Sequence, residues 1–267
     1  MASTRNTRPV AGGRRRLTAR SVLASTLLGL NPPELSARAL VGGAELLGVT
    51  PGTARVAISR MVAAGELEPT ADGYRLAGHL LQRQARQDLS RSGARARWNG
   101  TWRTAIVPGE ARSAAQRTDL RRAMTTLRYG ELRDGVWLRP DNLPPGALAA
   151  AEAVAAHQTI AVVGTVADEH AVTARLWDLG GWAADAGALL AELTPLQTRL
   201  DRHDSSALAD GFVVAAAVLR HLQADPLLPA RLLPATWPGD ELRSAQGRFD
   251  ASFKAVLGDW HRARGGT

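Results

Sequence analysis

Hydrophobic residues at helical spacing open the chain. The pattern over 17–30 predicts a helix, based on Val22, Leu23, Leu27 and Leu30. A shorter helix is expected to end at Leu46-Leu47, because Gly48 suits a helix C-terminus. A third helix is expected from Pro51 to about Ala64, with a buried side formed by Ala54, Ile58, Met61 and Val62.

A β-hairpin is predicted directly after these helices. Residues 66–68 alternate like a short strand, Asp72-Gly73 suits a hairpin turn, and residues 74–76 return. Three helices closed by a two-stranded ribbon predict a winged helix-turn-helix domain. An ordinary helical hairpin beside a β-hairpin is the alternative. Residues 79–97 then predict a polar, arginine-rich linker helix with Leu81, Ala85 and Leu89 on one side.

The middle of the chain alternates between strand and helix patterns. Strands are expected at 102–107, 131–133, 136–139 and 159–163, and helices at 110–127 and 147–157. The resulting β-α-β-β-α-β order is that of a ferredoxin-like domain, a fold that hosts many functions. The remainder predicts three helices, with leucine-rich and aromatic stripes within 189–200, 208–222 and 242–260.

These elements predict an α+β multidomain protein. The expected parts are a disordered basic tail, a winged helix-turn-helix DNA-binding domain, a linker helix, a ferredoxin-like domain and a C-terminal helical domain, at residues 1–16, 17–78, 79–97, 98–166 and 167–267. The length of 267 residues and the hydrophobic content of 45% suit two or three folded domains.

The amino-acid composition indicates the cellular compartment in which the protein is found. The chain has no cysteine, which excludes disulfides, thiolate-bound zinc and iron–sulfur clusters and fits a reducing cytoplasm. No apolar run approaches the roughly 18–20 residues that cross a bilayer. The twin arginines before residues 21–30 resemble an export signal, but Arg20 abuts a short apolar stretch and Pro32-Pro33 follow. We therefore expect a cytoplasmic protein.

Charge is distributed unevenly along the chain. The net charge is +8, with +13 over residues 1–139 and −5 over residues 140–267. A basic half favours a polyanionic partner, most often nucleic acid, because arginines bind phosphates and release counterions. An arginine-rich proteome explains the preference for arginine over lysine, but it does not explain why the excess lies in one half.

The predicted third helix and the hairpin supply candidate DNA-binding residues. An arginine presents two donors to guanine in the major groove, and hydroxyls at a helix start can bind phosphate. Base-reading or near-base contacts are expected from Arg55, Ser59 and Arg60. Phosphate contacts are expected from Thr50 and Thr53, and a contact with phosphate or the minor groove is expected from Arg75 on the hairpin.

An enzyme is not expected from the residues present. A metal-dependent nuclease would need carboxylates at a strand end, and the first middle strand ends at Val107-Pro108 without one. The six histidines are scattered without the spacing of a metal pair. No cofactor or metal is therefore predicted. A metal-dependent nuclease, and a non-specific RNA-binding or scaffolding protein, are kept as alternatives.

Several segments resemble the PaaX family of transcriptional regulators. They are ARVAISRMVAAGELE at 54–68, WNGTWRTAIV at 98–107, R-x-x-L-R-R at 117–122, LRYGELRDGVWLRP at 127–140 and DPLLPARLLPATWPG at 225–239. The resemblance covers nearly the whole chain after the basic tail. It departs where many relatives have an acidic residue before the proline and this chain has Val107-Pro108.

The resemblance implies a DNA-binding repressor made of a winged helix, a Cas2-like middle domain and a helical C-terminal domain. It also implies a homodimer on double-stranded operator DNA, released by an acyl-CoA effector such as phenylacetyl-CoA. Such an effector needs cations, because the C-terminal half is acidic. The available arginines near the last two domains are Arg103, Arg139, Arg175, Arg231 and Arg243, and Trp177 and Trp182 could supply an apolar wall.

Overall fold

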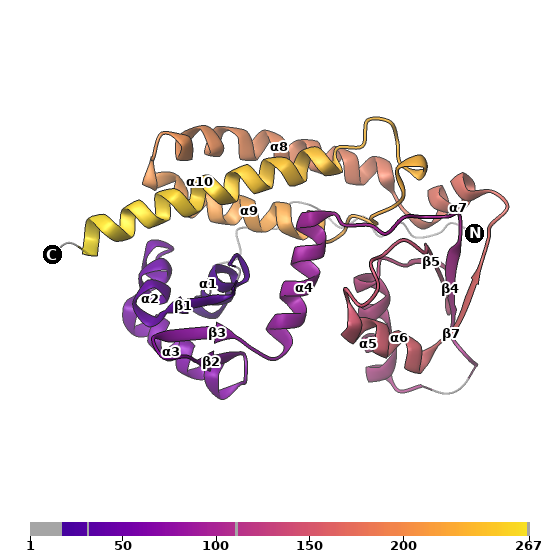
Figure 1. The fold of residues 1–267 in the computed structure, drawn as a ribbon, viewed down its shortest axis with the longest axis horizontal. Coiled ribbons are helices and arrows are strands. Elements are labelled where there is room, and N and C mark those ends of the chain that lie inside the picture. Colours follow the sequence, from indigo (N-terminus) through magenta and orange to yellow (C-terminus); the bar gives the residue numbers. More distant parts are fainter. Residues whose placement is uncertain (1–17, 31, 110–111, 266–267) are drawn as a thin grey trace. The chain divides into compact units, whose positions relative to one another are not determined.

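The computed structural model describes residues 18–265 apart from 31 and 110–111, with the side chains of 261–265 left aside. These residues fall into two compact units that meet between Leu76 and Ala77 (Figure 1). The predicted basic tail at 1–16, and the Asn31 of the predicted first stop signal, lie outside the described residues.

The first unit contains three helices and a small antiparallel sheet. Its elements are α1 (Ala19–Leu28), β1 (Glu34–Ser36), α2 (Ala37–Leu46), α3 (Pro51–Ala63), β2 (Leu67–Pro69) and β3 (Gly73–Leu76). The sheet order is β1-β3-β2. The three helices pack on one another through fully buried apolar side chains, among them Val22, Leu23, Leu27, Leu40, Ala54 and Met61.

β1 was not predicted, because its partner strand β3 is not adjacent to it in the sequence. It pairs with β3 at very close range, and Gly73 makes this possible. A Cβ at Gly73 would lie 1.9 Å from the Leu35 carbonyl oxygen. The predicted hairpin therefore forms with a third strand against its other edge, so that Arg75 lies between Glu34 and Glu68 in the register.

The second unit begins with a helix and an antiparallel sheet. The elements are α4 (His79–Ser92), β4 (Trp102–Ile106), α5 (Ala114–Thr126), β5 (Gly130–Arg133), β6 (Val136–Pro140), α6 (Ala149–Gln158) and β7 (Ile160–Gly164). The sheet order β5-β6-β4-β7, with α5 packed against α6, confirms the ferredoxin-like pattern. Leu120, Met124 and Ala105 belong to one buried cluster, and Trp102 and Leu138 belong to another.

Three predictions about these elements need correction. α4 is shorter than 79–97, and it buries Leu80, Gln84 and Leu89 while Leu81 and Ala85 are exposed. α5 begins at Ala114, because Ser113 and Gln116 form a reciprocal capping box; Glu110, the predicted start, lies outside the described residues. The helix ends before Arg128, whose φ is 63°, so Gly130 begins β5 instead of closing the helix.

Helices make up the rest of the second unit. They are α7 (Glu169–Leu176), α8 (Leu179–Asp201), α9 (Leu208–Leu222) and α10 (Gly239–Gly265), with short 3₁₀ turns η1 (Ser205–Ala207) and η2 (Ala230–Leu232). α8, α9 and α10 pack side by side (Figure 1). α7, which was not predicted, packs against β5. Buried residues of the three long helices include Leu193, Leu200, Val218, Leu222, Leu242, Phe249 and Val256.

One segment corrects the expectation about membrane spans. Ser205–Leu222 is long and apolar enough to cross a membrane by length and composition, with a mean hydropathy of 1.3. It corresponds to η1 and α9, and α9 contacts both α8 and α10. A core helix of a helical bundle has the same composition, because its apolar side chains face its neighbours.

Candidate nucleic-acid interface

α3 is a well-capped helix with one buried side and one exposed side. The Thr50 side chain accepts a hydrogen bond from the Thr53 backbone N–H at 3.3 Å, and Pro51 occupies the first turn, where no donor is needed. Ala54, Ile58 and Met61 are buried as predicted, whereas Val62 is half-buried. The helix ends at Ala63, and Gly65 follows the C-cap residue Ala64 with a φ of 66° that suits glycine.

The exposed side of α3 carries the predicted binding residues. Thr53, Arg55, Ser59 and Arg60 are all exposed. With 100° between successive residues, Arg55 and Arg60 flank the exposed side, and Ser59 lies between them with Val56. Within the described residues, Arg55 and Arg60 form no ion pair. The exposed side of this helix therefore presents two guanidinium groups that are available to an external anion.

Val56 is a residue that the sequence reasoning did not select. Its side chain is 52% exposed at the centre of the outward side of α3. Apolar side chains at such a position contact the thymine methyl group in DNA complexes. The helical spacing of residues 52–63 was sufficient to find it, because Val56 lies directly opposite the buried residues.

Two other arginines of the first unit are paired internally. Arg20 pairs with the buried Glu66, which raises the pKa of Arg20 through their hydrogen bond. Arg75 donates from Nε and Nη2 to Glu68 at 2.9 and 2.7 Å. This exposed pair occupies the Nε and Nη2 donors of Arg75, so Arg75 is less available to phosphate than the two arginines of α3.

The charged residues of the described part of the first unit balance one another. Residues 18–76 contain five arginines and five acidic residues, so the net charge of this part is zero. The basic excess of the first half therefore lies in residues 1–17 and 77–139. In the first unit, a positive surface depends on which arginines are paired internally, and the exposed side of α3 carries two that are not.

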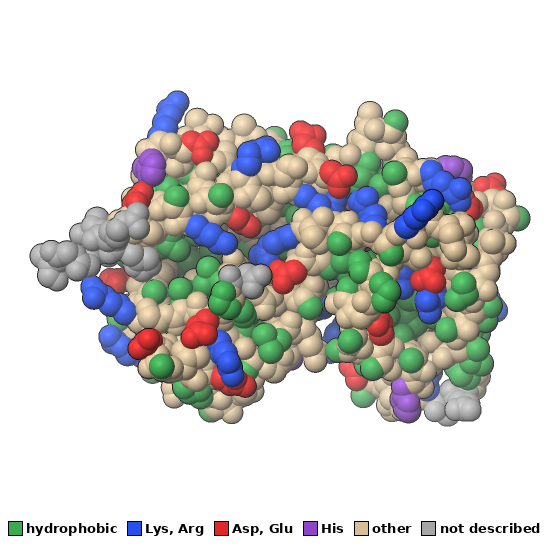
Figure 2. Space-filling model, viewed as in Figure 1, with side chains coloured by type: hydrophobic (Ala, Val, Ile, Leu, Met, Phe, Trp, Pro, Cys, Tyr) green, Lys and Arg blue, Asp and Glu red, His purple; other side chains and the backbone are tan. Residues whose placement is uncertain are grey.

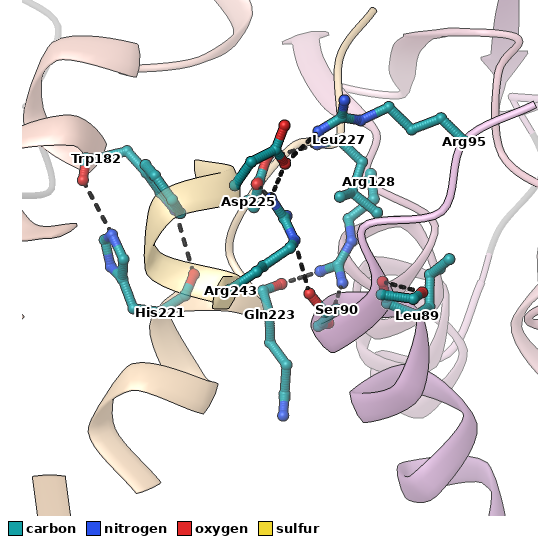
Figure 3. A network of polar contacts seen from close by, with 12 residues as sticks. Leu89, Ser90, Arg95, Arg128, Trp182, His221, Gln223, Asp225, Leu227 and Arg243 are labelled. Carbon is teal, nitrogen blue, oxygen red and sulfur yellow. Dashed lines mark hydrogen bonds and ion pairs between the residues drawn. The ribbon is translucent and has the colours of Figure 1, made fainter. Parts of the chain in front are cut away.

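A buried polar network connects the parts of the second unit (Figure 3). Arg243 of α10 donates to the Ser90 carbonyl at 3.0 Å and pairs with the fully buried Asp225. Arg128 donates to the Ser90 hydroxyl at 2.8 Å and to the Gln223 carbonyl. The network thereby joins α4, the turn after α5 and the segment between α9 and α10.

Burial lowers the pKa values of two side chains, Arg128 in this network and His221 beside it. Desolvation lowers the pKa of Arg128 to about 10, with Asp225 opposing the shift. His221 stacks on Trp182 with ring centroids 4.3 Å apart, and its Nε2 lies 2.9 Å from the Trp182 carbonyl oxygen. Burial lowers the pKa of His221. Burial within the second unit is the largest cause of both shifts.

A groove of about 530 Å³ lies beside the network, between the segment after α4 and the proline-rich segment before α10. Its lining includes Arg95, Trp98, Asn99, Asn142 and Arg231. The Arg231 guanidinium lies 4.2 Å from the Trp98 ring centroid, and its Nη2 donates to both carboxylate oxygens of Glu169 at 2.7 Å. The Nε and Nη2 atoms of Arg95 are buried without a hydrogen-bond partner, and Nη2 lies 3.6 Å from Asp240 Oδ1. Two arginines, each paired with a carboxylate of this chain, and an indole ring therefore line one concave space.

The predicted effector residues are distributed over several places in the second unit. Arg103 and Arg139 are opposite one another on β4 and β6, and Arg103 makes two hydrogen bonds to Asp141. Burial lowers the pKa of Arg139, whose guanidinium lies 5.2 Å from the Tyr129 ring. Arg175 lies on α7 and donates to the Leu132 carbonyl at 3.4 Å. Of the five arginines named from the sequence, Arg231 is the one that lines the groove.

The two predicted tryptophans belong to different ring stacks. Trp177 stacks on Trp102 with centroids 6.4 Å apart, inside the cluster beneath the sheet. Trp182 stacks between His221 and Trp237, and the Trp182–Trp237 centroid distance is 4.4 Å. Both indoles are occupied by neighbours of this chain. Trp98, which the sequence reasoning did not select, is the tryptophan of the groove.

Among the described residues, no group of three or more His, Asp or Glu side chains is arranged to hold a metal ion.

The geometry defines an α+β protein of three parts: a helical unit with an outward-facing α3, a four-stranded ferredoxin-like sheet and a helical bundle. Three family profiles match these parts in the same order. They are the PaaX-like protein profile over 18–80, the PaaX protein central Cas2-like domain over 95–176 and the PaaX-like protein C-terminal domain over 177–256. The chain belongs to the PaaX family, and this membership suggests a transcriptional regulator.

One solved structure is similar along nearly its whole length. It is titled uncharacterized protein Rv0674 from Mycobacterium tuberculosis, and it shares 40% sequence identity with this chain. The match covers 91% of this chain and 98% of that one, with a TM-score of 0.72. No curated protein matches the chain.

Proposed function

We propose that the protein is a DNA-binding transcriptional repressor in which α3 enters the major groove. The observation that carries this proposal is the exposed side of α3, where Arg55 and Arg60 have no ion pair with any described residue and Val56 and Ser59 lie between them. A helix fits the major groove, and arginine is the most common reader of guanine. Thr50 and Thr53 lie at the helix start, where backbone N–H groups favour phosphate.

Arginine substitutions in α3 test the DNA-binding proposal. Arg55→Ala and Arg60→Ala should each weaken binding to DNA from upstream of the protein's own gene by ~1–3 kcal/mol if the arginine reads a base, and should relax sequence preference. A phosphate contact should instead weaken binding to all sequences alike. Electrophoretic mobility shifts on specific and scrambled DNA distinguish the two cases.

The matched control is Arg220→Ala, which removes the same charge at an exposed position on α9 in the second unit. It should leave DNA binding close to that of the unmodified protein. If Arg55→Ala and Arg60→Ala bind as the unmodified protein does while remaining folded, α3 is not the reading helix. Arg75→Ala is expected to have a smaller effect, because Arg75 is paired with Glu68.

We further propose that the repressor acts in the cytoplasm as a homodimer and is released by an acyl-CoA effector. The groove beside Arg95, Trp98 and Arg231 supports an anionic ligand, since its volume of about 530 Å³ lies in the range of small-molecule sites. Arginine guanidinium groups pair with phosphate oxygens in two-pronged geometry. Arg103, Arg139, Arg175, Trp177 and Trp182 remain proposed effector contacts, and they rank below the groove residues because they do not line the groove.

Calorimetry tests the effector proposal. Phenylacetyl-CoA should bind and lower operator affinity, while phenylacetate and CoA titrated separately define which half of the ligand is recognised. Arg231→Ala should weaken this binding, whereas Arg199→Ala, which removes an exposed arginine paired with Asp204, should not. Absence of binding by all three compounds would overturn the ligand class and leave the DNA-binding proposal intact. If Arg231→Ala binds phenylacetyl-CoA as tightly as the unmodified protein does, the groove is not the effector site.

A further inference from the structure

The two edges of the central sheet are built differently. The β5 edge has a register irregularity between Glu131 and Arg133, carries both of these charges, and is contacted by α7. Bulges, charged side chains and covering helices keep a free strand edge from pairing with another chain. The β5 edge is therefore protected in three ways.

The β7 edge has none of these features. β7 pairs with β4 on one side, and no strand among the described residues pairs with its other side. The five residues Ile160–Gly164 include no charge and no proline, and all five are exposed. Ile160, Val162 and Val163 are 58%, 48% and 53% exposed, and Ile106, opposite Ile160 on β4, is 37% exposed.

This edge concentrates the exposed apolar surface of the protein. Of the seven large hydrophobic residues that are exposed in the described part of the chain, four belong to the β7 edge and its β4 neighbour. Figure 2 shows hydrophobic side chains at the surface along the margin where Figure 1 places β7. Exposed apolar patches of this kind mark interaction sites, and an uncharged open edge marks strand pairing.

We propose that β7 pairs in antiparallel fashion with β7 of a second copy of this chain, about a two-fold axis at Val162. The two four-stranded sheets would then form one continuous sheet. This inference rests on the proposed homodimer, and it assigns the strand that forms it.

The sequence of β7 is complementary to itself in this arrangement. With Val162 opposite Val162 of the partner subunit, Ile160 faces a glycine and Ala161 faces a valine, so a large side chain meets a small one at these positions. The pairing extends from 158 to 166 without placing any charged residue opposite another. Opposite residues share one face of a sheet, so Ile106, Ile160 and Val162 of both copies would line one apolar stripe.

A second copy explains this edge better than an extended segment of another protein. A foreign strand needs only the backbone groups of the edge, whereas the two-fold arrangement also uses the absence of charge along the whole strand and the small residues Ala161 and Gly164. Two identical surfaces related by a two-fold axis form a closed dimer that cannot extend into a fibre.

Charge substitutions at the two-fold axis test the pairing. Val162→Lys places two lysines opposite one another, and Val162→Glu places two glutamates opposite one another. Each variant should sediment as a monomer at micromolar concentrations at which the unmodified full-length chain is a dimer. An equimolar mixture should form the dimer again, because lysine then faces glutamate. The control Val213→Lys, at a 38% exposed position on α9, should remain dimeric.

A cysteine substitution reads the register directly, because the chain has no other cysteine. Val162→Cys should form an intermolecular disulfide on mild oxidation. Ile160→Cys should not, since the two residues at position 160 would lie four residues apart along the pairing, roughly 13 Å. Circular dichroism of each variant verifies that it is folded.

The outcomes separate this inference from the proposed function. A dimer that survives both Val162→Lys and Val162→Glu, or a mixture that stays monomeric, would overturn the β7 pairing while the homodimer stands. An unmodified chain that is a monomer in solution and on DNA would overturn the homodimer and the β7 pairing together. DNA binding through α3 is tested separately by Arg55→Ala and Arg60→Ala on a single half-site, which needs no dimer.

Discussion

At the scale of residues, the same side chain serves different purposes according to its partners. Arg20, Arg75 and Arg243 are each paired with a carboxylate, whereas Arg55 and Arg60 have no ion pair among the described residues. A carboxylate partner occupies part of the donor set of an arginine and offsets its charge, so an internally paired arginine is less available to an external anion than an unpaired one. The structure therefore reduces a long list of basic residues to a short one.

The buried Arg243–Asp225 pair gives a prediction at this scale. Arg243→Met should destabilise the protein by about 3–5 kcal/mol, because it leaves the carboxylate of Asp225 buried without its cation. Chemical denaturation measures this loss. The control Arg199→Met removes an exposed arginine from Asp204 and should cost no more than about 1 kcal/mol. Equal losses for the two variants would contradict a special role for the buried network.

At the scale of elements, short strands and helix ends depend on single residues. The β1–β3 contact of the first unit exists because Gly73 has no Cβ, and α3 begins where Thr50 and Pro51 cap it. α5 begins at Ser113 for the same kind of reason. Each of these residues fixes the position of a surface, since the hairpin and α3 are the parts of the first unit that we expect to meet DNA.

Gly73→Ala tests the dependence of the hairpin on this close approach. The added Cβ would meet the Leu35 carbonyl, so β1 and β3 must separate, and the first unit should lose about 1–3 kcal/mol of stability. All seven tryptophans lie in the second unit. Far-ultraviolet circular dichroism should therefore detect the loss of stability. The unfolding transition followed by tryptophan fluorescence, which reports on the second unit, should not shift.

The matched control for this prediction is Gly52→Ala in α3. A Cβ at Gly52 meets nothing within 4 Å, so alanine should stabilise the helix by about 0.5–1 kcal/mol. A Gly73→Ala variant as stable as the unmodified chain would show that β1 is dispensable for the first unit.

At the scale of the whole molecule, the chain combines a first unit whose residues 18–76 have zero net charge, a ferredoxin-like sheet and a helical bundle. α4 is the first helix of the second unit, and the Ser90 contacts tie it to α10 through Arg243 and to the turn after α5 through Arg128. A ligand in the groove beside Arg95 would lie next to this network, so an effector there could alter the position of α4. This connection is the physical route that we propose for release from DNA.

A two-fold dimer predicts the form of the operator. The bound DNA should be an imperfect palindrome whose half-site centres lie about 34 Å apart, or a multiple of that distance, because one helical turn separates equivalent faces of the groove. Footprinting measures the spacing. A single asymmetric half-site, together with a monomer by light scattering, would contradict this expectation.

Much of the fold could be predicted from local patterns. The order of strands and helices in the ferredoxin-like domain, and the start of α3 at Thr50-Pro51, follow from hydrophobic periodicity and capping residues. β1 and α7 were missed, because each is short and its stability comes from a neighbouring element. The buried side of α4 was predicted incorrectly, because Gln84 and Gln87 are polar and are buried all the same.

The sequence alone determined most of the helices and strands, the order of the ferredoxin-like domain and the candidate arginines, because periodicity, caps and turn residues act over a few positions. Only the tertiary structure decided which arginines are paired, that Trp98 and Arg231 share a groove, and that β7 is an open edge. These properties depend on contacts between residues far apart in the chain. No local pattern encodes such contacts, since a charge is neutralised, or a strand left open, by whatever the fold brings beside it.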